Sequence, residues 1–253
     1  MITNYAQNTI NQYQKTSESK SKILYFPTAP EANIKNRASK PIKSKSKPTM
    51  AVQPLKTEED VQAAKAYFLN KPERYENQNI RDYAIFVCGI NIARRGGDLL
   101  KLKVSDVLNE DSSLKNHITI KEQKTGKIST MKMVPVIEDA LLIYLSTLDD
   151  LNLNDPLFPS RKKDKHGNKK PMTIQNYYYK MQGLKAELKL ECPIGTHTMR
   201  KTWGYHALRN NKDDSNILAN ISKVYNHSNI ETTFRYLGIE QEEIDATFLN
   251  NQL

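Results

Sequence analysis

Hydrophobic residues recur at helical spacing along most of the chain, starting just after Thr57. There a hydroxyl is followed three residues later by the carboxylate of Asp60, the spacing of a capping box, and apolar residues then return every three or four positions. The same periodicity predicts further helices over residues 79–93, 140–148, 173–188, 196–208, 215–225 and 232–237. The pattern therefore predicts a mainly α-helical domain.

One stretch alternates with a period of two instead. Ile118 and Ile120 are separated by polar residues, which is typical of a strand, and Lys124-Thr125-Gly126-Lys127 then supplies a turn that contains glycine. A second strand is predicted to follow this turn and to end at Val136. The expected fold class is α+β, mainly helical with a small antiparallel β-hairpin.

Two segments are predicted to interrupt these elements. Gly96-Gly97 is expected to break or bend the chain after the second helix. Residues 161–170 are charged and contain Gly167, and they are expected to form a mobile surface loop.

Composition separates the first 50 residues from the rest of the chain. Residues 1–50 hold eight Lys and one Arg against two Glu, a formal +7 of the +10 carried by all 253 residues, and they lack a hydrophobic period. They are predicted to be a largely disordered basic arm, although the apolar cluster 23–26 could dock on a folded surface. Residues 51–253 are predicted to form the folded domain. Lysine contacts to phosphates release counterions, so a nucleic-acid partner is expected to bind Lys43, Lys45 and Lys47.

Other features exclude whole classes of protein. The longest apolar stretch, residues 84–93, falls well short of the roughly 20 residues that span a bilayer. The start of the chain has no basic region followed by an apolar run, so no secretory signal is expected. Cys88 and Cys192 lie far apart without metal-ligand spacing, which predicts reduced thiols in a cytoplasmic protein.

Three segments contain the residue types that chemistry on a phosphodiester demands. They are Ala-Arg-Arg-Gly-Gly-Asp-Leu-Leu-Lys-Leu at 93–102, Gly-Thr-His-Thr-Met-Arg-Lys-Thr at 195–202, and Asn-His-Ser-Asn-Ile-Glu-Thr-Thr-Phe-Arg-Tyr at 226–236. Together they resemble the tyrosine recombinases, the phage integrase family. The signature is an Arg three residues before an acidic residue, then His-x-x-Arg, then a His nine residues before a Tyr. The resemblance covers roughly residues 52–250 and implies the catalytic-domain fold of that family.

The resemblance implies that DNA is cut and rejoined through a 3′-phosphotyrosine bond, with Tyr236 as the nucleophile. Arg95 and Arg200 would clamp the non-bridging oxygens of the phosphate, because guanidinium groups bind them bidentately and stay charged. An alternative for Arg95 is a pair with Asp98 that ties down the turn. Arg94 is the neighbouring candidate, but the spacing to the acidic residue favours Arg95. No metal ion or other cofactor is expected, since the arginines supply the charge.

The resemblance also implies roles for two histidines and a lysine. His197 would assist proton movement at the nucleophile or hydrogen-bond a phosphate oxygen, and His227 would donate to a non-bridging oxygen. Lys124, before the glycine of the predicted hairpin turn, would protonate the leaving 5′ oxygen, with Lys121 and Lys127 as competitors.

A turn is predicted between the second histidine and the tyrosine. Nine residues at about 100° each would place His227 and Tyr236 on opposite sides of an ideal helix. The sequence Asn226-His227-Ser228-Asn229 is typical of a turn.

The chain departs from the family pattern in several places. Tyr225-Asn226 stands where relatives usually have Leu-Gly, and Lys201 replaces a residue that is often His. Tyr225 is the nearest rival of Tyr236, but it precedes the second histidine and fits no family position. In place of the helical core-binding domain of relatives there is only the basic arm, so the DNA clamp is missing, shortened to that arm, or supplied by another protein. Residues 237–253 form a tail that packs either on a neighbouring protomer or on its own domain.

The leading hypothesis is a site-specific recombinase that integrates or excises a phage or another mobile element. Its expected partners are double-stranded DNA, three further copies in a tetramer on synapsed sites, and accessory DNA-bending or directionality factors, with no membrane. Two alternatives stay open. One is a topoisomerase-like enzyme that nicks and reseals a single duplex, and the other is a DNA-binding regulator that keeps the fold without turnover.

Overall fold

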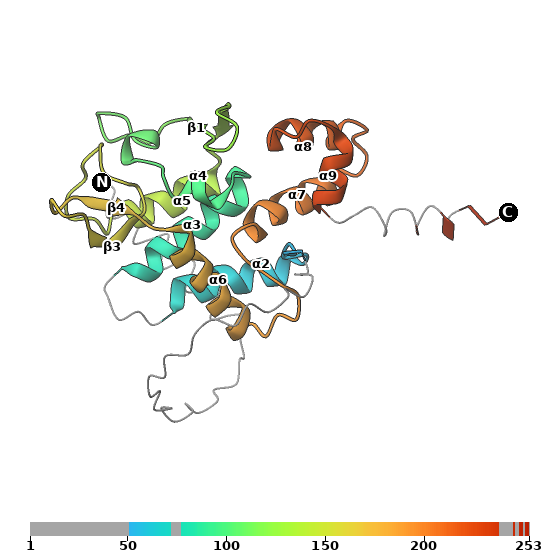
Figure 1. Cartoon of the computed structure of the whole chain (residues 1–253), viewed down its shortest axis with the longest axis horizontal. Helices are drawn as coiled ribbons and strands as arrows, with labels where there is room; N and C mark the ends of the chain where they lie inside the picture. The colour runs from blue at the N-terminus through green and yellow to red at the C-terminus, as the bar shows by residue number, and fades with distance from the viewer. Residues whose placement is uncertain (1–50, 72–76, 238–244, 246–247, 250, 253) are drawn as a thin grey trace, which may run out of the picture.

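The computed structural model describes residues 51–71, 77–237, 245, 248, 249, 251 and 252 (Figure 1). The predicted basic arm, with Lys43, Lys45 and Lys47, lies outside the described residues, and so does most of the predicted tail. Both therefore stay predictions.

The elements of the described residues follow the helical pattern of the sequence. In chain order they are α2 (Glu58–Asn70), α3 (Gln78–Ile92), α4 (Gly96–Leu99), η1 (Val104–Asp106), β1 (His117–Lys121), β2 (Ile128–Lys132), α5 (Pro135–Leu145), β3 (Pro159–Lys163), β4 (Lys169–Pro171), α6 (Ile174–Glu187), α7 (Thr198–Asn210), α8 (Ile217–Tyr225) and α9 (Ile230–Leu237). The hydroxyls of Thr57 and Thr173 accept hydrogen bonds from the first turns of α2 and α6, which fixes where these helices begin.

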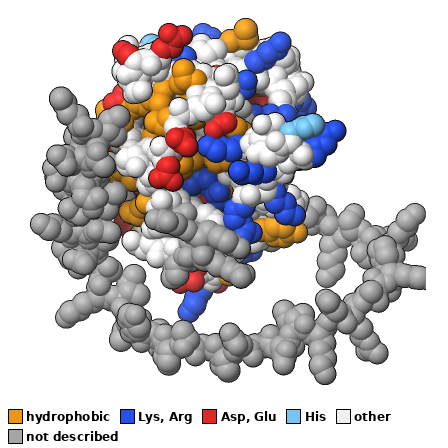
Figure 2. Space-filling model, turned by 90° about the vertical axis from the view of Figure 1, so that its left-hand side faces the viewer, with side chains coloured by type: hydrophobic (Ala, Val, Ile, Leu, Met, Phe, Trp, Pro, Cys, Tyr) orange, Lys and Arg blue, Asp and Glu red, His pale blue; other side chains and the backbone are white. Residues whose placement is uncertain are grey.

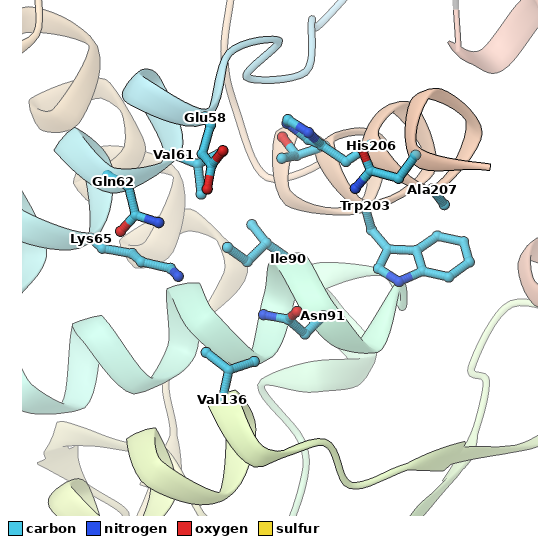
Figure 3. Close-up of a pocket in the computed structure, with 12 residues that line it drawn as sticks. Glu58, Val61, Gln62, Lys65, Ile90, Asn91, Val136, Trp203, His206 and Ala207 are labelled. Carbon is cyan, nitrogen blue, oxygen red and sulfur yellow. The ribbon is translucent and has the colours of Figure 1, made fainter. Parts of the chain in front are cut away.

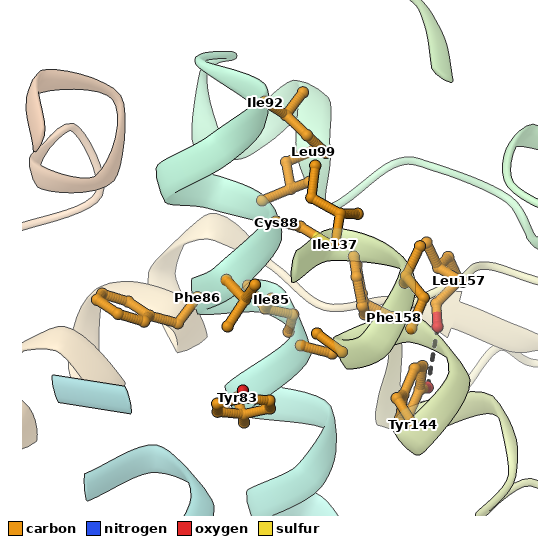
Figure 4. Packing of buried hydrophobic residues seen from close by; sticks show 14 of the residues in the cluster. Tyr83, Ile85, Phe86, Cys88, Ile92, Leu99, Ile137, Tyr144, Leu157 and Phe158 are labelled. Atoms are coloured by element: carbon orange, nitrogen blue, oxygen red, sulfur yellow. Dashed lines mark hydrogen bonds between the residues drawn. The ribbon is translucent and has the colours of Figure 1, made fainter. Parts of the chain in front are cut away.

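Helix α3 is the centre of the main hydrophobic core. It is apolar on nearly all sides, and it packs against α2, α5 and α7, as a helix without a polar face must. Figure 4 shows Ile85 and Cys88 of α3 beside Ile137 of α5. The hydroxyl of Tyr144 in α5 donates to the carbonyl oxygen of Leu157 at 2.9 Å, so this buried phenol is satisfied.

Strands β1 and β2 form the predicted antiparallel hairpin. Ile118 pairs with Met131 and Ile120 with Ser129, and both isoleucines point into the core. Gly126 has φ +68°, a conformation that favours glycine at this turn. The prediction that the second strand runs to Val136 was wrong. β2 ends at Lys132, and Pro135 begins α5, because the fixed φ of proline suits the first turn of a helix.

Two further predictions need correction. Gly96-Gly97 does not break the chain but begins α4, and the change of direction comes earlier, at Ala93, which has φ 59°. Residues 161–170 were predicted to form a loop, but part of this segment is strand. Strands β3 and β4 pair there as a second antiparallel hairpin, and the Asp164 carboxylate accepts the backbone N–H groups of His166 and Asn168 at its tip.

A smaller hydrophobic cluster joins α7, α8 and α9 at the opposite end of the molecule from β3 and β4 (Figure 1). Its buried members are Ala93, Ile221, Tyr225 and Leu237. Tyr236 packs against this cluster, so the last described helix is held mainly by its two predecessors.

A cavity of about 440 Å³ lies between α2 and α7, beside the C-terminal end of α3. Figure 3 shows Glu58 and Lys65 of α2 on one side of it, and Trp203 and His206 of α7 on the other. The six residues predicted to be catalytic do not line it. No helix among the described residues is long and apolar enough to cross a membrane.

Gly204 of α7 lies against Tyr225 of α8 and Leu237 of α9, which predicts a cost for any side chain there. A Cβ at this position would lie 2.1 Å from the Tyr225 hydroxyl and 2.8 Å from Leu237 Cδ2. Gly204→Ala should therefore lower the free energy of unfolding by about 1–3 kcal/mol, the usual cost of overpacking. Urea denaturation measures this change. Gly97→Ala is the control, since no atom lies within 4 Å of its added Cβ, and equal stability of the two variants would contradict the prediction.

Candidate active site

Arg95 lies between the end of α3 and the start of α4. It is paired with Glu122 and not with Asp98, the alternative considered from the sequence. Its Nη1 donates to Glu122 Oε2 at 2.7 Å, and its side chain is 25% exposed. The alternative pair of Arg95 with Asp98 is not formed. Asp98 Oδ1 instead accepts the backbone N–H of Gln123 at 3.0 Å, which ties α4 to the hairpin.

The neighbouring Arg94 points into the interior. It is 4% exposed and donates from Nη1 to Glu122 Oε1 at 2.7 Å and to the Ser129 hydroxyl at 3.1 Å. Of the two adjacent arginines, Arg95 is therefore the one that retains access to solvent and to a ligand.

Lys124 lies in the turn between β1 and β2 and is exposed. Its charge acts on the His197 ring, whose pKa it helps to lower. The hairpin thus brings this amine towards the histidine, although the two residues are 73 positions apart in the sequence.

His197 and Arg200 lie at the start of α7, as their spacing predicted. Arg200 is almost fully buried, and its Nη2 donates to the carbonyl oxygen of Tyr225 at 2.7 Å. The Arg200 guanidinium also lies 4.5 Å from the centre of the Tyr225 ring. Its Nη1 is buried and has no hydrogen-bond partner within the described part of the chain, so the N–H groups of this nitrogen remain for a ligand.

His227 follows the predicted turn. Helix α8 ends at Tyr225, Asn226 adopts a left-handed conformation with φ 55°, and α9 begins at Ile230. His227 Nδ1 lies 3.0 Å from the Thr233 hydroxyl, which orients the ring from within α9.

Tyr236 closes the site from α9. Its hydroxyl lies 3.2 Å from His197 Nδ1, and its ring is 5.4 Å from the His227 ring and 5.9 Å from the Arg200 guanidinium, measured between centres. Tyr225, its rival from the sequence, is fully buried and donates to the carbonyl oxygen of Arg200. Tyr225 is thus a core residue that supports the arginine.

Burial and the local cations set the protonation states of these groups. Burial lowers the pKa of His227, the charges of Arg200 and Arg95 lower it further, and the result is about 4. The pKa of His197 is lowered by burial and by the same arginines. Burial raises the pKa of Tyr236, and Arg200 and Arg95 offset only part of that rise. Both imidazoles are therefore neutral at pH 7, and the phenol keeps its proton.

Three residues near the site were not among those that the sequence predicted to take part in its chemistry. Glu122 is the shared partner of the two adjacent arginines, and Asn226 Nδ2 donates to the same carboxylate at 2.7 Å. Lys201 was noted only as a departure from the family pattern, yet its ammonium lies 5.0 Å from the centre of the Tyr236 ring. Lys201 follows Arg200 directly in the sequence, and this position next to a predicted site residue is the feature that would indicate it.

Within the described ranges, no three His, Cys, Asp or Glu side chains are grouped so that they could hold a metal ion. The polar groups that face Tyr236 are instead cations and imidazoles.

Comparisons with known proteins give the class to which this fold and site belong. The model of the phage integrase family matches residues 57–243. The chain is 34% identical over 197 residues to the probable integrase/recombinase YoeC of Bacillus subtilis strain 168. The alignment covers 78% of this chain and 95% of YoeC. The chain therefore belongs to the phage integrase family, the tyrosine recombinases, which are DNA strand-transferring enzymes.

Solved structures show the same fold. The crystal structure of XerA recombinase aligns with a TM-score of 0.59 at 20% identity, over 83% of this chain and 67% of XerA. The post-cleavage complex of XerH recombinase with palindromic difH substrate aligns with a TM-score of 0.56 at 18% identity, over 77% of this chain. The match spans about half of the XerH chain, 52%. The predicted family, enzyme class and fold are thereby confirmed.

The protonation states of the two histidines are open to direct measurement. In a nuclear magnetic resonance titration of the free protein, the His227 ring should titrate near pH 4 and the His197 ring below 6.5. Both shifts go downward because burial and the adjacent arginines disfavour the imidazolium form. His227→Gln and His197→Gln each remove one resonance and so assign the signals. A His227 midpoint at or above 6.5 would contradict this account of the site.

Proposed function

We propose that this chain cleaves and rejoins duplex DNA at specific sites, with Tyr236 as the nucleophile that takes the 3′ phosphate and releases a 5′ hydroxyl. The contact between the Tyr236 hydroxyl and His197 Nδ1, beside the unpartnered Nη1 of Arg200, is the observation that carries this proposal. A phenol, a proton acceptor and a free guanidinium donor are the parts that attack on a phosphodiester requires.

Proton transfer in the proposed first step follows from the pKa directions. Neutral His197 accepts the phenol proton as the Tyr236 oxygen forms its bond to phosphorus. Charge that develops on the non-bridging oxygens is stabilised by Arg95 and Arg200, with His227 as a further donor. The bond from phosphorus to the 5′ oxygen then breaks, and Lys124 supplies the proton to that oxygen.

The second step reverses the first with a different strand. A 5′ hydroxyl attacks the phosphotyrosine, its proton passes to Lys124, and Tyr236 leaves with a proton returned by His197. The two steps exchange one phosphodiester for another, so the reaction is close to isoenergetic and consumes no cofactor.

All three lysines are exposed, and the charge that Lys124 exerts on the His197 ring supports its choice over the other two. Lys124 and Lys127 both lie between the strands, whereas Lys121 is the last residue of β1; the Lys127 carbonyl oxygen accepts the backbone N–H of Glu122. A turn residue can reach a ligand that approaches the open side of the site, and it acts on His197 by its charge.

The β3–β4 hairpin is proposed to bind the DNA backbone beyond the cleaved phosphate. Figure 2 shows Lys and Arg side chains gathered on the face that carries β3 and β4. The exposed cations of the hairpin are Arg161, Lys162, Lys163, Lys165, Lys169 and Lys170. Helix α6 follows directly, and a Cβ on Gly96 would lie 3.0 Å from Ile174 Cδ1, so the base of the hairpin is close to the arginine segment.

The biological role is proposed from the family and from the residues outside the described part. YoeC is a probable integrase/recombinase, and the XerH structure is a post-cleavage complex with its difH substrate. By this analogy the chain acts on double-stranded DNA, assembles as a tetramer on two paired sites, and integrates or excises a mobile element with accessory DNA-bending or directionality factors. The basic arm, through Lys43, Lys45 and Lys47, would add phosphate contacts.

The covalent intermediate provides the first test. With a nicked suicide duplex that carries an authentic site, the wild-type protein should form a denaturation-resistant adduct with the fragment that ends in the 3′ phosphate. Tyr236→Phe should abolish the adduct, because it removes only the attacking oxygen, while Tyr179→Phe, at an exposed tyrosine of α6, should leave it unchanged. Denaturing electrophoresis with label on either side of the cleaved bond measures both outcomes. An adduct that persists in Tyr236→Phe would refute the assignment of the nucleophile.

The basic hairpin provides a second, separate test. The variant Lys162→Gln/Lys163→Gln/Lys165→Gln should lower duplex affinity and flatten its salt dependence, by roughly 0.9 in the log–log slope for each phosphate that a lysine no longer neutralises. Fluorescence anisotropy over a series of salt concentrations measures the slope. Lys189→Gln/Lys212→Gln removes charges elsewhere and serves as the control. An unchanged slope in the hairpin variant would exclude the hairpin from the DNA interface.

A further inference from the structure

Glu122 is a fully enclosed carboxylate that accepts four hydrogen bonds from three separate parts of the chain. Oε1 accepts from Arg94 Nη1 and from Asn226 Nδ2, each at 2.7 Å. Oε2 accepts from Arg95 Nη1 at 2.7 Å and from the Thr125 hydroxyl at 2.8 Å. The side chain has no exposed surface, so these bonds replace the water that a carboxylate requires.

The carboxylate is ionised over the whole working range of pH. Burial alone would raise its pKa, but the hydrogen bonds from Arg95, Asn226, Thr125 and Arg94 outweigh burial and lower the pKa to about 2. A full negative charge therefore sits between two guanidinium groups at the back of the proposed site.

Each donor belongs to an element that carries a proposed catalytic group. Arg95 is such a group itself. Thr125 is adjacent to Lys124 in the hairpin turn, and Asn226 is adjacent to His227 in the turn after α8. One side chain thus fixes an arginine and the two backbone segments that hold the amine and the second imidazole.

We propose that Glu122 is a positioning residue for strand transfer. It holds the Arg95 guanidinium towards the transferring phosphate. Through Thr125 and Asn226 it also fixes the positions of the Lys124 turn and the His227 turn relative to that guanidinium. This inference rests on the proposed function. Glu122 itself is buried and does not touch the phosphate.

A neutral amide cannot replace the carboxylate. A glutamine at position 122 has one accepting oxygen and an NH₂ group that must donate, whereas all four partners of Glu122 are donors. At least one arginine therefore loses its acceptor. The two guanidiniums would also repel each other without the intervening negative charge, so Arg95 would move from its present position.

The test compares cleavage with binding in Glu122→Gln. At saturating suicide duplex, the rate of adduct formation should fall on the order of 100-fold, the effect of an ångström-scale misplacement, while duplex affinity should change less than about threefold. Glu110→Gln removes an exposed carboxylate and should match the wild-type rate. Equal rates for Glu122→Gln and Glu110→Gln would overturn the proposal.

A second variant separates positioning from folding. Glu122→Gln leaves Arg94 buried without a counterion, which can unfold the protein, whereas Arg94→Met/Glu122→Gln removes both buried charges. This double variant should recover thermal stability but remain slow in cleavage. If it cleaves at the wild-type rate, Glu122 merely neutralises Arg94 and the proposal fails.

The pathway through Arg95 is tested by a double-mutant cycle. Adding Glu122→Gln to Arg95→Ala should slow cleavage much less than the same change slows the wild-type protein, because the residue through which Glu122 acts is already gone. An equal slowing in both backgrounds would refute the coupling. Absence of any adduct from the wild-type protein would instead refute the proposed function itself, so the two failures are distinguishable.

Discussion

Several cations that share one small region repel one another, and the site can exist only because each has a partner of matching chemistry. Arg94 and Arg95 share the Glu122 carboxylate, Arg200 donates to the Tyr225 carbonyl oxygen and lies over the Tyr225 ring, and Lys201 lies over the Tyr236 ring. A single carboxylate does not neutralise this set. The remaining positive charge faces Tyr236, where the negative charge of a phosphate would neutralise it.

The same imbalance fixes where the protons are before a substrate arrives. Burial and the arginines keep His197 and His227 neutral, and burial keeps the Tyr236 phenol protonated despite those arginines. In the free protein the protonated phenol of Tyr236 therefore lies beside the neutral imidazole of His197, which can accept its proton. Because a phosphate adds negative charge next to both rings, it favours the imidazolium form of His197 as the proton arrives. In the proposed reaction, phosphate binding and activation of Tyr236 would thus be coupled through one electrostatic field.

Side chains that the sequence motifs placed in one site do lie together around Tyr236, but the motifs did not predict the residues that join this site through long-range contacts. The grouping of the Arg, His and Tyr side chains could be predicted because their motifs resemble the signature of the family, and α3 could be predicted because its apolar surface is continuous. Glu122 could not be predicted, since its partners Arg94, Arg95 and Asn226 lie 28, 27 and 104 positions away. The strands β3 and β4 were also missed, because exposed charged strands show no alternation of apolar and polar residues.

The site also divides into a rigid part and a more loosely held one. Arg94 and Arg95 come just after α3 and its cap residue Ala93, and Arg200 lies in the first turn of α7. Met199 of α7 packs so closely on Gly89 of α3 that a Cβ on this glycine would lie 2.0 Å from the Met199 sulfur. These cations are therefore fixed by the main core. Tyr236 lies on α9, which packs mainly on α7 and α8 through the smaller cluster. A smaller buried cluster means a lower free energy of local opening, so α9 can shift its phenol while the arginines stay in place. In the proposed reaction Tyr236 attacks, remains bound to DNA and then leaves, and a helix held in this way suits those steps better than the core would.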